Sequence, residues 1–284
     1  MRNKILYIRT ENLNFFYRIN RELTRLNIKF EVLNIRDKLP NVPSIILTTV
    51  GEIHKFKNSY ENLIILSYSY EENFQHYVLK VLAAYKIEYK DFYSDLMFSI
   101  DPGTKQIGIA IFLDDLFLIS HTIYDKREFI EFIDDKVNCF QENNPFLMKL
   151  EFKFGSGVLP LTIELLKEVY DHFGMNKNKK IFLIDESKSS KTKIKDKKKR
   201  VRTKHEISAL ILALRRGKEI TQFNYTKIFK QIKLQEQNLN KDSNKNIVEL
   251  DESLDNLKQL IDKILNNEIS LSLSSKILYG NITE

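Results

Sequence analysis

An aspartate stands at the end of an apolar stretch, where the chain could hold a metal ion. Phe98–Ile111 reads FSIDPGTKQIGIAI, so Asp101 ends one predicted strand, a Pro-Gly turn follows, and a second strand returns past Gly108. Strand ends in a sheet are rigid and would keep this carboxylate still, as a metal ligand requires. Gly108 would leave room for a phosphate or an ion near the backbone. The alternative is a plain hairpin, because Asp-Pro-Gly is also common turn chemistry.

A run of basic residues is the second feature with chemical meaning. Between Lys188 and Lys204 the chain carries ten Lys or Arg residues and one acid, Asp196, whereas its whole net charge is +7. The basicity is therefore local, which is typical of a segment that binds a polyanion, most often nucleic acid. The run has no aromatic residue, so it predicts contacts with the phosphate backbone rather than base stacking. A solvated loop is the alternative. The basic residues are Lys188, Lys191, Lys193, Lys195, Lys197, Lys198, Lys199, Arg200, Arg202 and Lys204.

Composition places the chain among globular proteins. Its 284 residues are 43% hydrophobic and 29% charged, which is enough apolar material for a core and too much for general disorder. One cysteine, Cys139, excludes an internal disulfide and a zinc site built of thiolates. No apolar run approaches the roughly 20 residues that span a bilayer, and the first residues do not form a signal peptide. We therefore expect a cytoplasmic protein with no membrane partner.

Hydrophobic periodicity predicts two folded segments. Residues 1–95 alternate short apolar strands with amphipathic helices, which predicts a small α/β domain with a parallel sheet. This domain has no Gly-rich phosphate loop and no evident acid–base pair, so its role stays unknown. Residues 96–217 read as three antiparallel strands, helix, strand, helix, strand and helix, with Asp114-Asp115 as the tight turn of a hairpin.

The remaining residues, 218–284, show no strand periodicity and predict a helical extension. Ile228–Ile232 suggests one amphipathic helix and Leu254–Leu265 a second, separated by a polar linker. Two such helices have little to bury against each other, so we expect them to pack on the core or on a second copy of the chain.

Two classes of enzyme carry a hairpin similar to the one at Asp101. ATPases of the actin and Hsp70 type hold ATP phosphates with it, whereas RNase H-like nucleases use the Asp to bind catalytic metal ions. The ATPase interpretation requires a second Asp-x-Gly hairpin and a Gly-rich adenosine site. The eight glycines of the chain provide neither, which favours the nuclease.

The segment 96–217 resembles the RuvC/YqgF branch of the RNase H-like superfamily. Three motifs in order carry the resemblance: IDPGTKQIGIAI (100–111), LIDESKSSKT (183–192) and HEISALILAL (205–214). The whole layout is similar to an uncharacterised archaeal RuvC-like group. The resemblance implies an α/β fold in which an RNase H-like mixed sheet is flanked by helices, with a small α/β domain before it and a helical tail after it.

The resemblance also implies a set of acidic ligands on the strands. Asp101 matches the first-strand acid of the superfamily. Glu186 matches the fifth-strand acid of YqgF-like proteins, with Asp185 beside it as the alternative. Glu151, in LEFKFGSG, lies where RuvC-type enzymes carry a fourth-strand Glu. A solvated strand face explains Glu151 equally well, because alternation places it with two lysines. One of these, Lys153, could contact phosphate together with the following Gly-Ser-Gly turn.

The last helix departs from the family pattern. The resemblance expects an Asp at the position of His205 and, in RuvC enzymes, a further Asp at Ser208. Here the acid is displaced to Glu206. Some RuvC-type enzymes use a His at the first position, where it can bind a metal or relay a proton. The alternative is that His205 is simply a helix-start residue in a basic segment.

These residues together predict a Mg²⁺-dependent endonuclease, with Mn²⁺ as a possible substitute. Its site would be made of Asp101, Glu151, Glu186, His205 and Glu206. The resemblance implies RuvC-type cleavage of branched DNA such as Holliday junctions, in recombination or repair, by a homodimer. A nucleic-acid-binding protein that has lost catalysis and a YqgF-like RNA-processing nuclease are the alternatives.

Overall fold

The computed structural model describes most of the chain as two compact units. Unit 1 comprises residues 1–92 and 138–142, and unit 2 comprises 93–137 and 143–284. Within them the described residues are 5–56, 63–142, 144–174, 176–185, 201, 203–221, 224 and 251–279. No helix among these residues is long and apolar enough to cross a membrane.

Unit 1 is built on a parallel four-stranded sheet, as its alternating pattern predicts. The strand order is β2-β1-β3-β4. Every neighbouring pair is parallel, and helices follow β1 and β4 in the chain. The elements are β1 (Ile5–Ile8), α1 (Leu13–Arg25), β2 (Glu31–Val32), β3 (Ser44–Thr49), the 3₁₀ helix η1 (Val50–Lys55), β4 (Leu63–Tyr68) and α2 (Phe74–Lys86).

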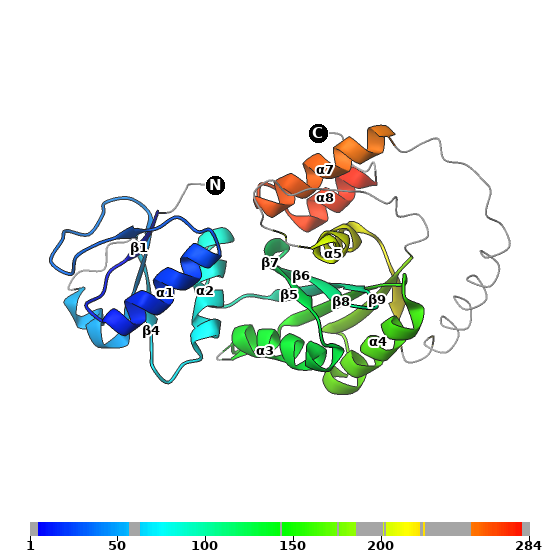
Figure 1. The fold of residues 1–284 in the computed structure, drawn as a ribbon, viewed down its shortest axis with the longest axis horizontal. Helices are drawn as coiled ribbons and strands as arrows, with labels where there is room; N and C mark the ends of the chain where they lie inside the picture. Colours follow the sequence, from blue (N-terminus) through cyan, green and yellow to red (C-terminus); the bar gives the residue numbers. More distant parts are fainter. Residues whose placement is uncertain are drawn as a thin grey trace. The chain divides into compact units, whose positions relative to one another are not determined.

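Unit 2 contains a six-stranded mixed sheet in the order β10-β9-β8-β5-β6-β7 (Figure 1). The central strand β5 pairs antiparallel with β6 on one side and parallel with β8 on the other. The strands are β5 (Asp95–Pro102), β6 (Ile107–Leu113), β7 (Leu116–Ile123), β8 (Lys149–Gly155), β9 (Lys179–Ile184) and β10 (Lys218–Ile220). An antiparallel meander that continues into two parallel strands confirms the expected topology. The fold is RNase H-like.

Helices cover both faces of this sheet. They are the short η2 (Lys126–Glu128), α3 (Phe129–Gln141), α4 (Leu159–Phe173) and α5 (Lys204–Leu214), with α7 (Asp251–Leu265) and α8 (Leu271–Leu278) after them. Figure 1 shows α3 and α4 on one face and α5, α7 and α8 on the other. Strand alternation divides the side chains accordingly. Phe152 stacks on Phe98 and on Phe173 of α4, whereas Ser99 points the other way and donates to the Ala209 carbonyl of α5.

The tight turn between β6 and β7 forms where the sequence places it. Asp114 and Asp115 have φ angles of 46° and 70°, so both adopt the left-handed conformation that a two-residue hairpin turn requires. Strand β10 was not expected. It pairs three residues with β9 in antiparallel fashion, and three residues are too few to show a strand period.

The helices α7 and α8 pack on the core of unit 2. Leu260, Ile261 and Ile264 of α7 are at most 5% exposed and lie in one apolar cluster with residues of α5, β6 and β7. The apolar stripe that suggested a dimer is therefore buried within its own chain. The predicted helix around Ile228–Ile232 falls outside the described residues.

Hydrogen bonds of Asn267 and Asp115 attach this helical pair to the β6–β7 hairpin. The Asn267 side chain accepts a hydrogen bond from the Phe117 N–H and donates one to the Phe117 carbonyl, both at 2.9 Å. The carboxylate of Asp115 accepts from the Ser272 N–H, at the start of α8. Asn267 itself has a φ of 55°, which an Asn tolerates better than most residues.

Replacing Asn267 should loosen this attachment. Asn267→Ala removes two buried hydrogen bonds and leaves a residue with a Cβ in the left-handed region, which should cost about 2–4 kcal/mol of unfolding free energy. Asn267→Gly keeps the backbone conformation accessible and should cost less. Chemical denaturation of the two variants beside the wild type measures the difference, and equal stability of all three would contradict this account.

Candidate active site

Asp101 lies near the end of the central strand β5, and its carboxylate is largely buried. The residue is 7% exposed and is paired with Gly108 on β6. Burial raises the pKa of Asp101. The hydrogen bond to His205 and the positive charges of His205 and Lys204 oppose this rise in the pKa without cancelling it. A buried acid with a raised pKa beside a specific charged partner is typical of functional sites.

His205 meets this carboxylate from the first turn of α5. Its Nδ1 lies 2.7 Å from Oδ2 of Asp101, and the side chain is 20% exposed. Thr203 caps the helix, because its hydroxyl accepts from the Glu206 N–H. The helix start thus aims the imidazole at the strand end, and the structure brings these two candidate residues together.

Two glycines allow the helix to come this close. A Cβ on Gly108 would lie 2.2 Å from the carbonyl carbon and oxygen of His205, and a Cβ on Gly103 would lie 2.5 Å from its Cε1. Any larger residue would therefore push α5 away from the hairpin. The space beside Gly108 is filled by the start of α5, not kept for a phosphate or an ion as the sequence suggested.

The rest of α5 runs back along β5 and β8, and Lys153 is part of its attachment. The ammonium of Lys153 donates to the Ala213 carbonyl at 2.7 Å and lies 3.4 Å from that of Arg215, at the end of the helix. Burial lowers the pKa of Lys153, and the nearby Glu151 partly offsets this. A cation at a helix C-terminus is stabilising. These contacts give Lys153 a structural role that the phosphate interpretation did not foresee.

Glu206 does not face Asp101. The residue is only 2% exposed, and its carboxylate accepts hydrogen bonds from the hydroxyls of Ser120 and Thr122 of β7, each at 2.6 Å. The Thr122 hydroxyl also lies 2.9 Å from that of the capping Thr203. Glu206 therefore holds the first turn of α5 against β7. Its carboxylate does not join Asp101 and His205 in the candidate site.

Glu151 lies far from Asp101 along the sheet. Its Cα is level with Met97 on β5, whereas Phe154 is level with Ile100. Four residues separate Met97 from Asp101, which is about 13 Å at the rise of a β-strand. Glu151 lies 3.6 Å from Lys153 at the C-terminal end of α5. The register therefore separates Glu151 from the candidate ligands, and this part of the expectation is corrected.

Strand β9, which matches the fifth strand of the family, ends at the same end of the sheet as Asp101. Ile184 pairs with Gly155, the residue after the one that pairs with Ile100. Asp185 follows and is exposed. Glu186 and the basic residues from Lys188 to Arg202 lie outside the described residues, whereas Lys204 is exposed at the start of α5. No group of three His, Cys, Asp or Glu that could hold a metal occurs within the described part of the chain.

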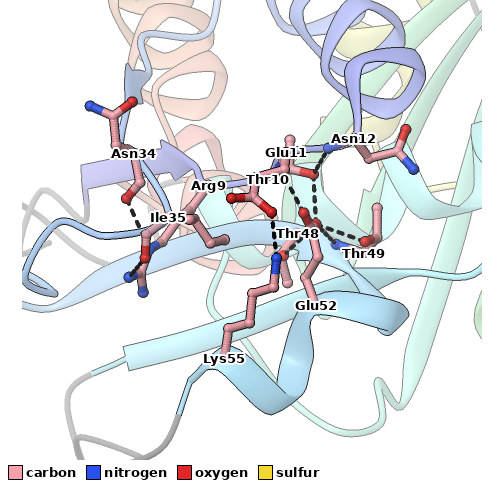
Figure 2. Close-up of polar contacts among 10 residues, drawn as sticks. All are labelled: Arg9, Thr10, Glu11, Asn12, Asn34, Ile35, Thr48, Thr49, Glu52 and Lys55. Atoms are coloured by element: carbon pink, nitrogen blue, oxygen red, sulfur yellow. Dashed lines mark hydrogen bonds and ion pairs between the residues drawn. The ribbon is translucent and has the colours of Figure 1, made fainter.

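Unit 1 contains a second polar cluster, at the carboxyl ends of β1 and β3 (Figure 2). The Glu52 carboxylate accepts from the hydroxyls of Thr10 at 2.6 Å and Thr49 at 2.7 Å, and from the Glu11 N–H at 2.6 Å. The strand order reverses between β1 and β3, which is where ligands of open α/β sheets bind. Here the Glu52 carboxylate, and not a ligand, accepts the hydrogen bonds at this position. Sequence reasoning missed Glu52, although Thr49-x-x-Glu52 has the spacing of a capping box.

Arg9 forms the other half of this cluster. It is 5% exposed, and its guanidinium donates to the carbonyls of Asn34, Ile35 and Asp37 (Figure 2 shows the first two). These bonds fix the loop after β2 to the end of β1. Its cation also lies 4.8 Å from the ring centroid of Phe56. Arg9 is thus fully committed to structure.

Comparisons with known proteins give little beyond this geometry. No protein-family model and no curated protein matches the chain. Solved structures of the Argonaute of Aquifex aeolicus show a weak similarity, with 12% identity over 64% of this chain and 34% of that one, and a TM-score of 0.21. Another, described as having externally bound siRNA, gives 13% identity and the same TM-score over 64% of this chain and 35% of that one. The chain spans about a third of those proteins. The strand order of the sheet, and not this similarity, indicates the RNase H-like fold.

Asp101→Asn should not destabilise the protein. Because burial raises the pKa of Asp101 above its ordinary value of 3.8, the ionised form costs folding free energy at neutral pH. Asparagine removes that charge and still offers an oxygen to His205 Nδ1. Thermal unfolding at pH 7 should show an unchanged or higher Tm. A clear fall in Tm would mean that the ionised pair stabilises the fold.

Glu52→Gln should destabilise unit 1 in a pH-dependent way. Burial pushes the pKa of Glu52 up, but the hydrogen bonds from Thr10, Glu11 and Thr49 outweigh it and hold the pKa below 4.5. The ionised carboxylate therefore stabilises the fold above about pH 4.5, and this contribution is lost as the pH falls through the lowered pKa. The stability difference between wild type and variant, measured by urea unfolding, should be largest near neutral pH and shrink in acid. A constant difference would contradict this.

Proposed function

We propose that the chain is a metal-dependent nuclease of RuvC type that cuts branched nucleic acid. The observation that carries the proposal is the contact between Asp101 at the end of the central strand and His205 at the start of α5, with 2.7 Å between Nδ1 and Oδ2. The RNase H-like sheet supports it, because the residues that the resemblance marks as site residues come from β5 and α5 in the expected order.

The pair can handle a proton. With Asp101 ionised, its Oδ2 accepts the Nδ1–H of His205, which fixes the tautomer and leaves Nε2 able to accept a proton from water. The burial of Asp101 strengthens this hydrogen bond, because the local dielectric is low. Lys204 adds a positive charge beside the pair, suited to a phosphodiester.

The described residues fit a magnesium ion in part. Asp101 offers the oxygen ligand that Mg²⁺ prefers, and Mg²⁺ takes one or two carboxylates and completes its shell with water and substrate phosphate. Glu186 would be the second carboxylate. A bound Mg²⁺ or Mn²⁺ would supply Lewis-acid activation of the phosphate and of water. The Nε2 atom of His205 would then orient a water molecule or accept a proton from it.

Cleavage of labelled substrates tests the proposal. A four-way DNA junction, a linear duplex and a single-stranded RNA are incubated with Mg²⁺ and with Mn²⁺. Wild type is compared with Asp101→Asn and with Asp95→Asn, the same substitution at the opposite end of β5. We expect wild type and Asp95→Asn to cut the junction at similar rates, because Asp95 lies away from the site. The cutting rate of Asp101→Asn should fall by at least 100-fold.

The other outcomes separate the alternatives. Cutting of RNA alone would favour the RNA-processing nuclease. Salt-sensitive binding without cutting in either metal would mean that the fold serves as a nucleic-acid-binding protein. The latter has one observation in its favour, since the carboxylate of Glu206, the acid of the last helix, is held by hydroxyls of β7 while Asp101 contacts His205. If the protein neither binds nor cuts any of these substrates, the proposal is overturned.

A further inference from the structure

An exposed tyrosine lies at the same sheet edge as the Asp101–His205 pair. Tyr124 follows directly after β7 and is 72% exposed, the largest value among the large hydrophobic side chains of the described residues. Burying aromatic surface lowers the free energy in water, so a tyrosine this open is a candidate contact for a ligand with a flat face. Nothing in the sequence around Tyr124 marks it, because it stands between a strand and a short helix.

The strand register connects Tyr124 with the candidate active site. Asp101 on β5 is level with Gly108 on β6, which is level with Thr122 on β7. Two strand spacings, about 10 Å, therefore separate Asp101 from Thr122 across the sheet. Tyr124 is two residues further on, about 7 Å beyond the row at the rise of a strand. The tyrosine thus stands within a nucleotide or two of the carboxylate.

The position of Thr122 also fixes the end of β7 relative to α5. Its hydroxyl touches both Glu206 and Thr203, the first-turn and capping residues of that helix. Hydrogen bonds therefore join the end of β7 to the start of α5, two residues before Tyr124 and on either side of His205. Tyr124 stands on a rigid support, as a contact that positions a substrate requires.

Exposed positive charges lie on the elements next to the pair. Lys105 is exposed in the turn that joins β5 to β6, and Lys204 is exposed at the start of α5. The sequence before Lys204 is the basic run. The nearest acid to Tyr124 in the chain, Asp125, is bound by the Arg127 guanidinium, whose hydrogen bond lowers the pKa of Asp125 to about 2. Cations beside an open aromatic ring are the combination with which proteins hold single-stranded nucleic acid.

We propose that Tyr124 is a stacking platform for an unpaired base, with Lys105 and Lys204 contacting the phosphates on either side, so that a nucleotide is held next to Asp101 and His205. This inference depends on the proposed function for its ligand class, and it adds the preference for unpaired nucleotides that a basic run without aromatic residues does not provide. Single-stranded DNA and single-stranded RNA share this chemistry.

A tryptophan at this position would report stacking directly. The chain has no tryptophan, so Tyr124→Trp introduces a single fluorophore. The full-length variant is titrated, without added divalent metal, with a single-stranded DNA 12-mer, the RNA of the same sequence and the paired DNA duplex. We expect saturable quenching by the single strands and much less by the duplex. Tyr17→Trp, at a residue 68% exposed in unit 1, is the matched control and should not be quenched.

Binding by the natural side chain gives the second measurement. Tyr124→Ala should weaken single-strand binding about tenfold or more, as loss of one base stack does, whereas Tyr124→Phe should bind like wild type. Tyr17→Ala should also bind like wild type. Which of DNA and RNA binds more tightly identifies the source of the base.

The outcomes keep the two proposals apart. If wild type binds single strands and Tyr124→Ala binds equally well, or if Tyr124→Trp is not quenched at saturation, the stacking inference is overturned and the proposed function stands. If wild type binds neither these strands nor the four-way junction, both fail. If the duplex quenches as strongly as the single strands, Tyr124 contacts the backbone and the preference for unpaired bases is wrong.

Discussion

The close packing of the α5 start on the β5–β6 hairpin is the constraint on which the candidate site depends. Gly108 lets the helix backbone lie against β6, and Gly103 makes room for the imidazole of His205. The distance between His205 and Asp101 depends on this contact, since a larger residue at either glycine would push the helix away from the hairpin. Ser99 and Lys153 then hold the rest of α5 against the sheet by hydrogen bonds to its carbonyls.

Charge is distributed unequally between the two ends of α5. At its start, burial raises the pKa of Asp101, so the carboxylate is held at a cost. At its end, the Lys153 ammonium satisfies carbonyls that the helix leaves unpaired. Glu206 is satisfied by two hydroxyls of β7. Burial lowers the pKa of Lys153 as it raises that of Asp101, so both charges are held at a cost. The charge at the start of α5 is the one that lies beside His205 and could serve function, which agrees with the trade between stability and function seen in active sites.

Sequence patterns predicted the elements of the fold well, and two of the candidate residues that they marked, Asp101 and His205, lie in contact. Asp101 was found because Asp-Pro-Gly between two apolar strands is a local signal, and His205 because it begins an apolar helix. The position of Glu151 could not be found, because alternation tells the face of a strand and not its register with a neighbour. Lys153 and Glu206 have partners 60 and 86 residues away in the chain, and no local pattern reports such contacts. Glu52 was missed although a capping-box spacing was present.

The attachment of α7 and α8 to the β6–β7 hairpin affects how the protein matures as it is made. Asn267 binds Phe117 across 150 residues of sequence, and the apolar cluster over α5 includes residues as late as Leu271. Since a nascent chain folds from its N-terminus onward, unit 1 can form while the rest is still being synthesised. The outer face of α5 stays uncovered until residues 251–279 have left the ribosome. A product lacking them would expose this face to aggregation, so the helix that carries His205 gains its full support only after α7 and α8 have been made.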